Sequence, residues 1–333
     1  MESDAIDAFD VESLVPGFRP PPQPAAEADA AAIVRADRAM RRWHSPDPGP
    51  LVPGSDAHLR AMCRMFRDTF NPYRPAVLDW PRLAPEVRER IVSLPIWDIA
   101  VQTEGKARLR MAAYAATLPA PGIRDALALN AWEEHRHKEV LARMVAAYGI
   151  ALVPEAPAVM PKDAEWAYLV TGYSECIDSF FAFGLFELAR RSGLFPQALV
   201  DTFEPVMQEE CRHILLFANW AGWHRARLGP WRRVRFECKV AAVWAFLIWE
   251  RIGLARSVDA GASSSRQDNN FTLNGARSVS AGGADMPTLL ALCLAENDRR
   301  FAGYDERLLR PQTVPRLVRL VLRLLRRFPA QDR

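Results

Sequence analysis

The sequence predicts an all-helical protein built around a bundle of four long helices. From about residue 86 to 226, it has few internal glycines or prolines, many Ala, Leu, Glu and Arg residues, and no strand-like alternation. Chain-breaking residues interrupt this region at two short turns, 119–122 and 192–196, and at a long proline-rich connection, 149–161. This pattern is typical of two antiparallel helical hairpins joined by a crossover.

The breakers divide the chain into expected elements with a simple order. The four bundle helices are expected at 88–118, 123–148, 163–191 and 196–227, within a domain assigned to residues 86–228. Residues 1–85 are rich in proline and alanine and are expected to form an arm with short helices, one of them near 24–42. Residues 229–333 are expected to form a helical extension, with helices near 231–256 and 315–328 and a flexible Gly/Ser loop at 257–285.

Composition excludes several classes of function. A net charge of +3 over 333 residues is too small to indicate nucleic-acid binding. Five cysteines stand singly without CxxC spacing, which argues against a disulfide framework, a zinc ribbon or a rubredoxin-type centre and fits a reducing cytoplasm. The acidic first residues do not resemble a targeting peptide. The longest apolar run, 240–249, falls short of the ~20 residues that a membrane-spanning helix needs.

A five-residue pattern, Glu-Glu-x-Arg-His, occurs twice, at 133–137 and at 209–213. Within each copy, the second Glu and the His are three residues apart, so a helix presents both side chains on one face. These pairs are Glu134 with His137 and Glu210 with His213. Because one copy falls in the second helix of each expected hairpin, the sequence predicts a single site with pseudo-twofold symmetry.

Such a site needs one further carboxylate from the first helix of each hairpin. Two residues of an antiparallel hairpin lie at the same height when they are equidistant from the turn. Glu104 and Glu134 have their midpoint at residue 119, and Glu175 and Glu210 have theirs between residues 192 and 193. Both midpoints fall on the expected turns, so we expect all four carboxylates to converge.

Four carboxylates buried together without cations would be costly, because their repulsion and desolvation add. Metal binding is therefore expected, and carboxylate with imidazole suits iron or manganese better than thiophilic metals. The predicted ligands are Glu104, Glu134, His137, Glu175, Glu210 and His213.

The arrangement resembles the ferritin-like di-metal carboxylate superfamily over about residues 104–213. The full doubled pattern is similar to its oxygen-activating branch, the soluble acyl-carrier-protein desaturases and the bacterial multicomponent hydroxylases. The resemblance implies that Glu133 and Glu209 hydrogen-bond the histidine ligands and that Arg136 and Arg212 neutralise these carboxylates. The hydroxylases carry Asp where this chain has Glu, so this contact is expected to differ.

The resemblance also implies a function: two iron ions would use O2 to hydroxylate or desaturate a small apolar substrate, with electrons from an external reductase or ferredoxin-type donor. Ser179 or Asp178 would correspond to a polar group near the O2 site. Gly172 and Ser179 flank Glu175 by about one turn and could widen a substrate pocket, although ordinary close helix packing explains small residues equally well.

Several alternatives stay open. The same ligands are compatible with manganese as the metal, with a manganese catalase or other peroxide-scavenging protein, with a ferroxidase-type ferritin-like protein, and with a non-catalytic protein that metal stabilises. The basic amphipathic segment 315–328 leaves open contact with an anionic membrane, and a homodimer is also left open. His135, between the motif's ligands, is expected on the opposite side of its helix.

Overall fold

The structure is a computed structural model that describes residues 10–22, 29–73, 80–93, 97–152, 159–193, 195–259 and 285–327. Throughout these ranges the secondary structure consists of α-helices without a strand, which confirms the all-α prediction. A single isolated bridge joins Trp43 to Tyr304 and ties the N-terminal region to the C-terminal one.

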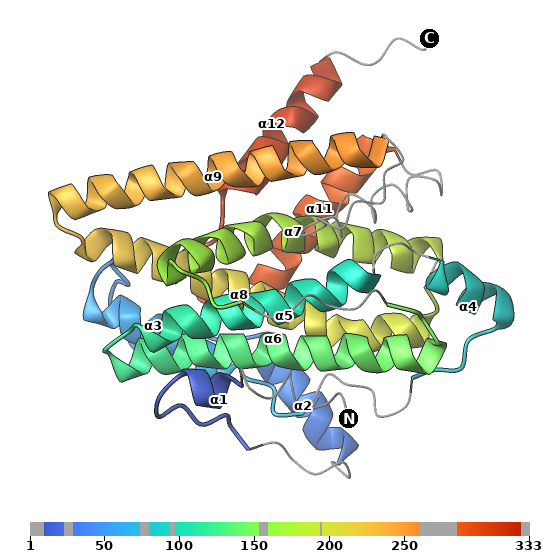
Figure 1. The fold of residues 1–333 in the computed structure, drawn as a ribbon, viewed down its shortest axis with the longest axis horizontal. Helices are drawn as coiled ribbons and strands as arrows, with labels where there is room; N and C mark the ends of the chain where they lie inside the picture. The colour runs from blue at the N-terminus through green and yellow to red at the C-terminus, as the bar shows by residue number, and fades with distance from the viewer. Residues whose placement is uncertain are drawn as a thin grey trace.

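Four long helices form the centre of the molecule (Figure 1). They are α5 (Trp97–Ala116), α6 (Pro121–Tyr148), α7 (Ala164–Ser192) and α8 (Gln197–Arg227). Helix α5 packs against α6 and α7, and α8 packs against α7 and α6, so the four helices enclose a common interior. Turns of four residues, 117–120 and 193–196, separate α5 from α6 and α7 from α8. Each of these two pairs is therefore an antiparallel hairpin.

Local sequence explains where the long helices begin and end. Gly149 follows α6 with φ 65° and Gly193 follows α7 with φ 67°, the left-handed conformation that ends many helices at glycine. Pro121 occupies the first turn of α6, where its missing N–H costs no hydrogen bond. The carboxylate of Asp163 accepts a hydrogen bond from the backbone N–H of Trp166 at 2.9 Å and caps α7.

The prediction of one continuous bundle helix over 88–118 is wrong. The structure has a short helix α4 (Pro85–Val92) and a separate α5 that begins at Trp97. Pro95 lies between them in the sequence, and proline disfavours helical conformation in the residue before it.

The remaining helices surround this centre. They are α1 (Val11–Leu14), α2 (Ala30–Met40), α3 (Asp56–Asp68), α9 (Pro230–Asp259), α11 (Met286–Phe301) and α12 (Thr313–Arg327). Helices α2, α9 and α12 correspond to the helices expected near 24–42, 231–256 and 315–328, whereas α11 was not expected. The first three residues of the expected loop 257–285 belong to α9, and most of the rest lies outside the described residues.

Packing of the outer helices encloses the interior on several sides. Helix α3 lies on α6 and α8, α9 lies along α7, and α11 packs closely on α7 (Figure 1). Gly184 permits the last contact, because a Cβ there would lie 2.3 Å from the Sγ atom of Cys293. Among the described helices, none has the length and apolar character that a membrane span requires.

Candidate metal site

The doubled motif forms a compact cluster between α6 and α8. One ligand atom from each of Glu134, His137, Glu210 and His213 lies within 4.8 Å of the other three. The side chains of both histidines and of Glu134 are at most 2% exposed, and that of Glu210 is 14% exposed. The i, i+3 spacing in each helix therefore brings the two halves of the motif to one point, as the sequence predicted.

Glu134 lies between the two imidazole rings. Its Oε1 atom is 2.6 Å from Nδ1 of His213, and its Oε2 atom is 3.9 Å from Nδ1 of His137. Glu210 approaches Nδ1 of His137 at 3.0 Å. The Nδ1 atoms of both rings therefore face the carboxylates, and the rings stack with centroids 5.3 Å apart.

Glu104 and Glu175 lie at the edges of this cluster. The Oε2 atom of Glu104 is 4.0 Å from Nδ1 of His137, and its side chain is 20% exposed. Both carboxylate oxygens of Glu175 are buried. Burial, followed by the charge of Glu134, raises the pKa of Glu104 and that of Glu175 well above the usual value. The positions that the hairpin midpoints selected are thus close enough to act on the cluster.

The opposite nitrogen of each ring is held by a carboxylate from the other helix. Nε2 of His137 on α6 donates a hydrogen bond to Glu209 on α8 at 2.8 Å. Nε2 of His213 on α8 donates one to Glu133 on α6, also at 2.8 Å. A ring that donates through Nε2 keeps the Nδ1 lone pair for a ligand when it is neutral.

Buried arginines neutralise the same two carboxylates. One guanidinium nitrogen of Arg212 donates to the two oxygens of Glu133 at 2.8 and 3.0 Å. Arg136 donates to Glu209. Each carboxylate therefore binds the consecutive Arg and His of the facing helix, and the two motifs are reciprocally linked.

The N-terminal arm completes the surroundings of these arginines. Nε of Arg212 donates to Thr69 Oγ1 at 2.8 Å, and another guanidinium nitrogen donates to the backbone carbonyl of Phe66 at 2.6 Å. Arg136 donates to the carbonyl of Asn71 at 2.9 Å. The sequence did not predict this contribution, because no local pattern links residues 66–71 to arginines that follow them by more than 60 residues.

The charges within the cluster raise the pKa of the histidine His213 and lower those of the carboxyl groups Glu133 and Glu134. Although burial opposes it, the negative charge of Glu134 and the hydrogen bond to Glu133 raise the pKa of His213 to about 10. Burial likewise opposes ionisation of Glu134, but the charge of His213 lowers its pKa to about 2. Burial also opposes ionisation of Glu133, but Arg212 holds the pKa of that carboxyl well below its usual range. The metal-free cluster thus holds protons in place of cations.

The chemistry of these donors fits metal ions. In the described part of the chain, both oxygens of Glu175 are buried without a hydrogen-bond partner. The Nδ1 atoms of His213 and His137 face carboxylate oxygens of Glu134 and Glu210 at 2.6 and 3.0 Å. Buried polar atoms are rarely left unpaired, and nitrogen and oxygen donors that converge on one point can hold a cation. Oxygen and imidazole donors together suit iron or manganese.

The two residues considered for O2 activation differ in their placement. Ser179 lies at the cluster, where its hydroxyl donates to Oε2 of Glu210 at 3.3 Å. Asp178 binds Arg251 of α9 at 2.8 Å and accepts a hydrogen bond from Ser174 at 2.8 Å. Asp178 therefore joins α7 to α9.

Gly172 serves close packing. A Cβ at Gly172 would lie 2.1 Å from the ring of Phe217, one helical turn after His213 on α8. Tyr168 and Phe183, on the same helix, are at most 1% exposed and belong to the core. The absent side chain of Gly172 thus allows α7 and α8 to approach rather than opening a cavity.

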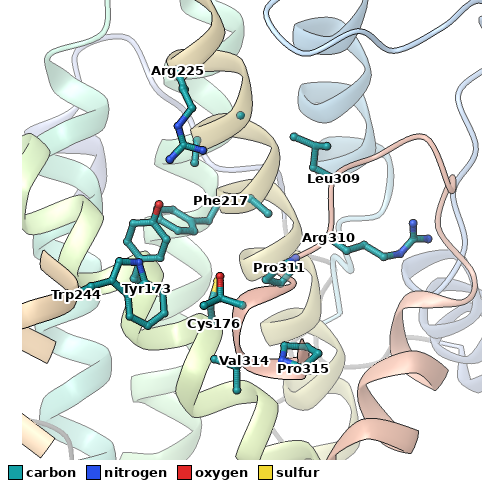
Figure 2. Close-up of a pocket in the computed structure, with 14 residues that line it drawn as sticks. Tyr173, Cys176, Phe217, Arg225, Trp244, Leu309, Arg310, Pro311, Val314 and Pro315 are labelled. Carbon is teal, nitrogen blue, oxygen red and sulfur yellow. The ribbon is translucent and has the colours of Figure 1, made fainter. Parts of the chain in front are cut away.

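A pocket of about 230 Å³ lies on the outer side of α7 and α8 (Figure 2). Cys176, which follows Glu175, and Phe217 both line it. Trp244 of α9 and the segment 309–315 before and into α12 complete much of the wall. Its lining is mainly apolar, and its wall carries Cys176, next to one predicted ligand, and Phe217, one helical turn after another.

The other histidines have different roles. His135 lies away from the cluster, and its Nδ1 is 3.1 Å from a guanidinium nitrogen of Arg108. His58 is buried, with Nε2 2.9 Å from Oδ1 of Asn219, and His224 lies 3.4 Å from Glu165. His135 is therefore a natural comparison for His137, two residues further along the same helix.

Comparison with known proteins gives no assignment: no family model, no curated protein and no solved structure matches this chain.

Proposed function

We propose that this protein is a ferritin-like, di-iron, O2-dependent oxidoreductase that acts on a small apolar organic substrate. The observation that carries the proposal is the reciprocal linkage of the two motifs around the convergent ligand atoms. Glu133 holds His213, Glu209 holds His137, and the Nδ1 atom of each ring faces a carboxylate of the cluster. An ion-pair network among the described residues does not account for the two buried oxygens of Glu175, which have no hydrogen-bond partner there.

The six predicted ligands divide into two sets. Glu104, Glu134 and His137 would hold one ion, and Glu175, Glu210 and His213 the other. Glu134 and Glu210 would bridge, which the position of Glu134 between the two rings supports. Two iron ions held there supply the capacity to reduce O2 and to oxidise a C–H bond of the substrate.

The chain's own residues prepare the site for this chemistry. The carboxylates of Glu133 and Glu209 keep a proton on Nε2 of each ring and fix its orientation. Arg136 and Arg212, each at most 2% exposed, balance these carboxylates without adding charge at the ligand side. Burial of the cluster excludes bulk water, which protects a reactive oxidant from side reactions.

The surroundings favour an apolar substrate and an external electron donor. Insertion of one oxygen atom from O2 consumes two electrons and two protons and releases water, so a reductase or ferredoxin-type partner must supply the electrons. Desaturation has the same requirement, because the substrate supplies only two of the four electrons that O2 takes. The mainly apolar pocket behind Cys176 and Phe217 supports a substrate of the same character.

The reaction with O2 tests the proposal. Chemically reduced, iron-loaded protein is expected to consume O2 rapidly, and His137→Gln is expected to abolish this reaction. His135→Gln is the matched control, because His135 is on the same helix but contacts Arg108 instead of the cluster. Equal O2 consumption by both variants would overturn the proposed site.

Other outcomes distinguish the alternatives. Retention of two manganese ions with rapid decomposition of peroxide would assign catalase chemistry. Oxidation of many ferrous ions for each chain would assign a ferroxidase. Metal that raises thermal stability but reacts with neither O2 nor peroxide would assign a structural role.

A further inference from the structure

Helix α9 has a second apolar face that no described part of the chain covers. Its inner face, Phe236, Val240, Val243 and Leu247, is at most 8% exposed. On the outer face, large apolar side chains remain in solvent: Trp231 is 87% exposed, Val234 58%, Ile248 55%, Trp249 70% and Ile252 49%. Large exposed apolar patches of this kind mark interaction surfaces.

The exposed residues follow the spacing of a helix–helix contact. The α9 seam, as we call it, consists of Trp231, Val234, Cys238, Ala241, Ala245, Ile248 and Ile252. Successive members are alternately three and four residues apart, which is the heptad spacing of paired helices. All seven are exposed. A helix that only covers its own core typically has polar residues on its outer face instead of a second apolar stripe.

The sizes of the seam residues have an approximate twofold pattern. Large side chains occur at both ends, and small ones, Cys238, Ala241 and Ala245, occupy the middle. An antiparallel copy centred on residue 243 would place Val234 opposite Ile252 and Ala241 opposite Ala245. The small residues would then let the helix axes approach at the centre, as an interface that uses the same surface twice requires.

Charge selects the antiparallel orientation. In a parallel pair, the exposed arginines 232, 233 and 235 of two copies would lie side by side and repel each other. In the antiparallel pair, Glu237 comes opposite Arg251 of the second copy along one flank. Arg235 comes opposite Trp249 along the other, where a guanidinium can stack on the ring. Their midpoints, 244 and 242, lie on either side of the same centre.

We propose that two copies of this chain associate through α9, packed antiparallel about a twofold axis near residue 243. Within each copy, Glu237 forms an ion pair with Arg225 at 2.6 Å and Arg251 forms one with Asp178 at 2.8 Å. The proposed contact between Glu237 and Arg251 would join these ion pairs across the interface. Helix α9 lies along the outside of the molecule (Figure 1), and its seam residues are exposed in the described structure. The proposal does not depend on metal or on catalysis.

A lipid surface fits the seam less well than a second copy. Interfacial helices usually insert bulky residues along their whole apolar face. The centre of the α9 seam instead offers Cys238, Ala241 and Ala245, which insert little apolar volume but suit close helix contact. The terminal side chains thus act as anchors at the two ends of a helix pair.

Sedimentation of the full chain tests this arrangement. The protein is expected to be a dimer at micromolar concentration, and Ala241→Glu is expected to make it monomeric with unchanged helix content by circular dichroism. Leu317→Glu on α12, at a residue that is 59% exposed, is the matched control and is expected to remain dimeric. A monomeric parent protein, or dissociation by Leu317→Glu with Ala241→Glu unaffected, would overturn the proposal.

Cysteine cross-linking tests the register and orientation. In a Cys238→Ser background, Ala241→Cys with Ala245→Cys is expected to form an intermolecular disulfide rapidly on mild oxidation. Native Cys238 provides the internal control: a centre at residue 243 separates it from its copy by roughly 15 Å along the helix axis, so it should not form a disulfide. Efficient linkage through Cys238, or binding of the monomer to anionic phospholipid vesicles without cross-linking, would contradict the antiparallel pair.

Discussion

Glu133 and His213 lie on facing helices, and the carboxylate of Glu133 accepts a hydrogen bond from Nε2 of His213 at 2.8 Å. Glu209 and His137 repeat this relationship in the opposite direction, also at 2.8 Å. Each motif is therefore incomplete without the other. The repetition in the sequence has a physical reason, since α6 provides the support for the α8 ligand and α8 provides the support for the α6 ligand.

Replacement of Glu133 by Gln removes the charge that faces Arg212 and leaves the guanidinium buried without its counter-ion. We expect a loss of about 3 kcal/mol in the free energy of unfolding, because breaking one side of a buried ion pair leaves an uncompensated charge. Metal affinity is expected to fall about 10- to 100-fold, since His213 loses its orienting acceptor. Urea unfolding and metal titration measure the two effects.

The double variant Glu133→Gln with Arg212→Met separates these contributions. Removal of the unpaired charge is expected to restore much of the stability, whereas the orientation of His213 remains unsupported and metal affinity remains low. Full recovery of metal affinity in the double variant would show that Glu133 acts on the site only through Arg212.

Two buried threonines provide a matched comparison for the N-terminal contact. Thr69 accepts a hydrogen bond from Arg212, and its hydroxyl donates to the carbonyl of Met65 at 2.6 Å. Thr69→Val should cost about 1–3 kcal/mol, because it leaves Nε of Arg212 unsatisfied. Thr171 Oγ1 is buried without a hydrogen-bond partner in the described chain, so Thr171→Val should be neutral or stabilising. Equal losses in urea unfolding would contradict the contact.

Metal binding is expected to release protons and to tighten as pH rises. The pKa of His213 is raised to about 10, that of His137 is raised, and those of Glu104 and Glu175 are raised well above their usual values. At pH 7 the metal-free site therefore holds protons that metal must displace. Calorimetric titration in buffers with different heats of ionisation measures their number. Heats that do not depend on the buffer would contradict this expectation.

The same shifts determine how the stability of the metal-free protein changes with pH. A histidine with a raised pKa stabilises the fold fully below its unfolded value of about 6.5, and this contribution is lost as pH rises through the folded value, about 10 for His213. The raised pKa values of Glu104 and Glu175 likewise lower the stability of the fold as pH rises above their unfolded value of about 4.5. Thermal unfolding should therefore show a falling melting temperature from pH 7 to 10 without metal, and a smaller fall with it.

Gly172→Ala tests the close approach of α7 and α8. Its Cβ would meet the ring of Phe217 at 2.1 Å, so the ring or the helices must move. We expect a loss of about 1–3 kcal/mol in stability, the usual cost of overpacking a core. Gly122→Ala is the control, because nothing lies within 4 Å of a Cβ there. A stability as high as that of the control would favour open space beside Gly172.

The sequence predicted the features that depend on short-range geometry. The two helical hairpins have turns close to the expected positions. The second is at 193–196, and the first is at 117–120 rather than 119–122, because Pro121 and Gly122 belong to the first turn of α6. A short turn fixes the relative heights of two helices, so Glu104 could be placed at the height of Glu134 from counting alone. The i, i+3 spacing similarly placed each Glu and His on one helical face.

The features that the sequence could not predict depend on contacts between distant segments. The support of Arg212 by Phe66 and Thr69 joins regions more than 140 residues apart. The ion pair of Asp178 with Arg251 of α9 joins residues 73 positions apart. Gly172 could not be assigned to a pocket or to packing until Phe217 was placed beside it. In each case a partner on another helix decides the role.

Anaerobic titration of the metal-free protein with ferrous iron tests the central claim most directly, because the proposed site has a fixed capacity. The account predicts saturation at two irons per chain, a new optical absorption after admission of air, and loss of both in His213→Gln. Failure to bind ferrous iron, or unchanged binding of two irons by His213→Gln, would contradict the proposed di-iron site.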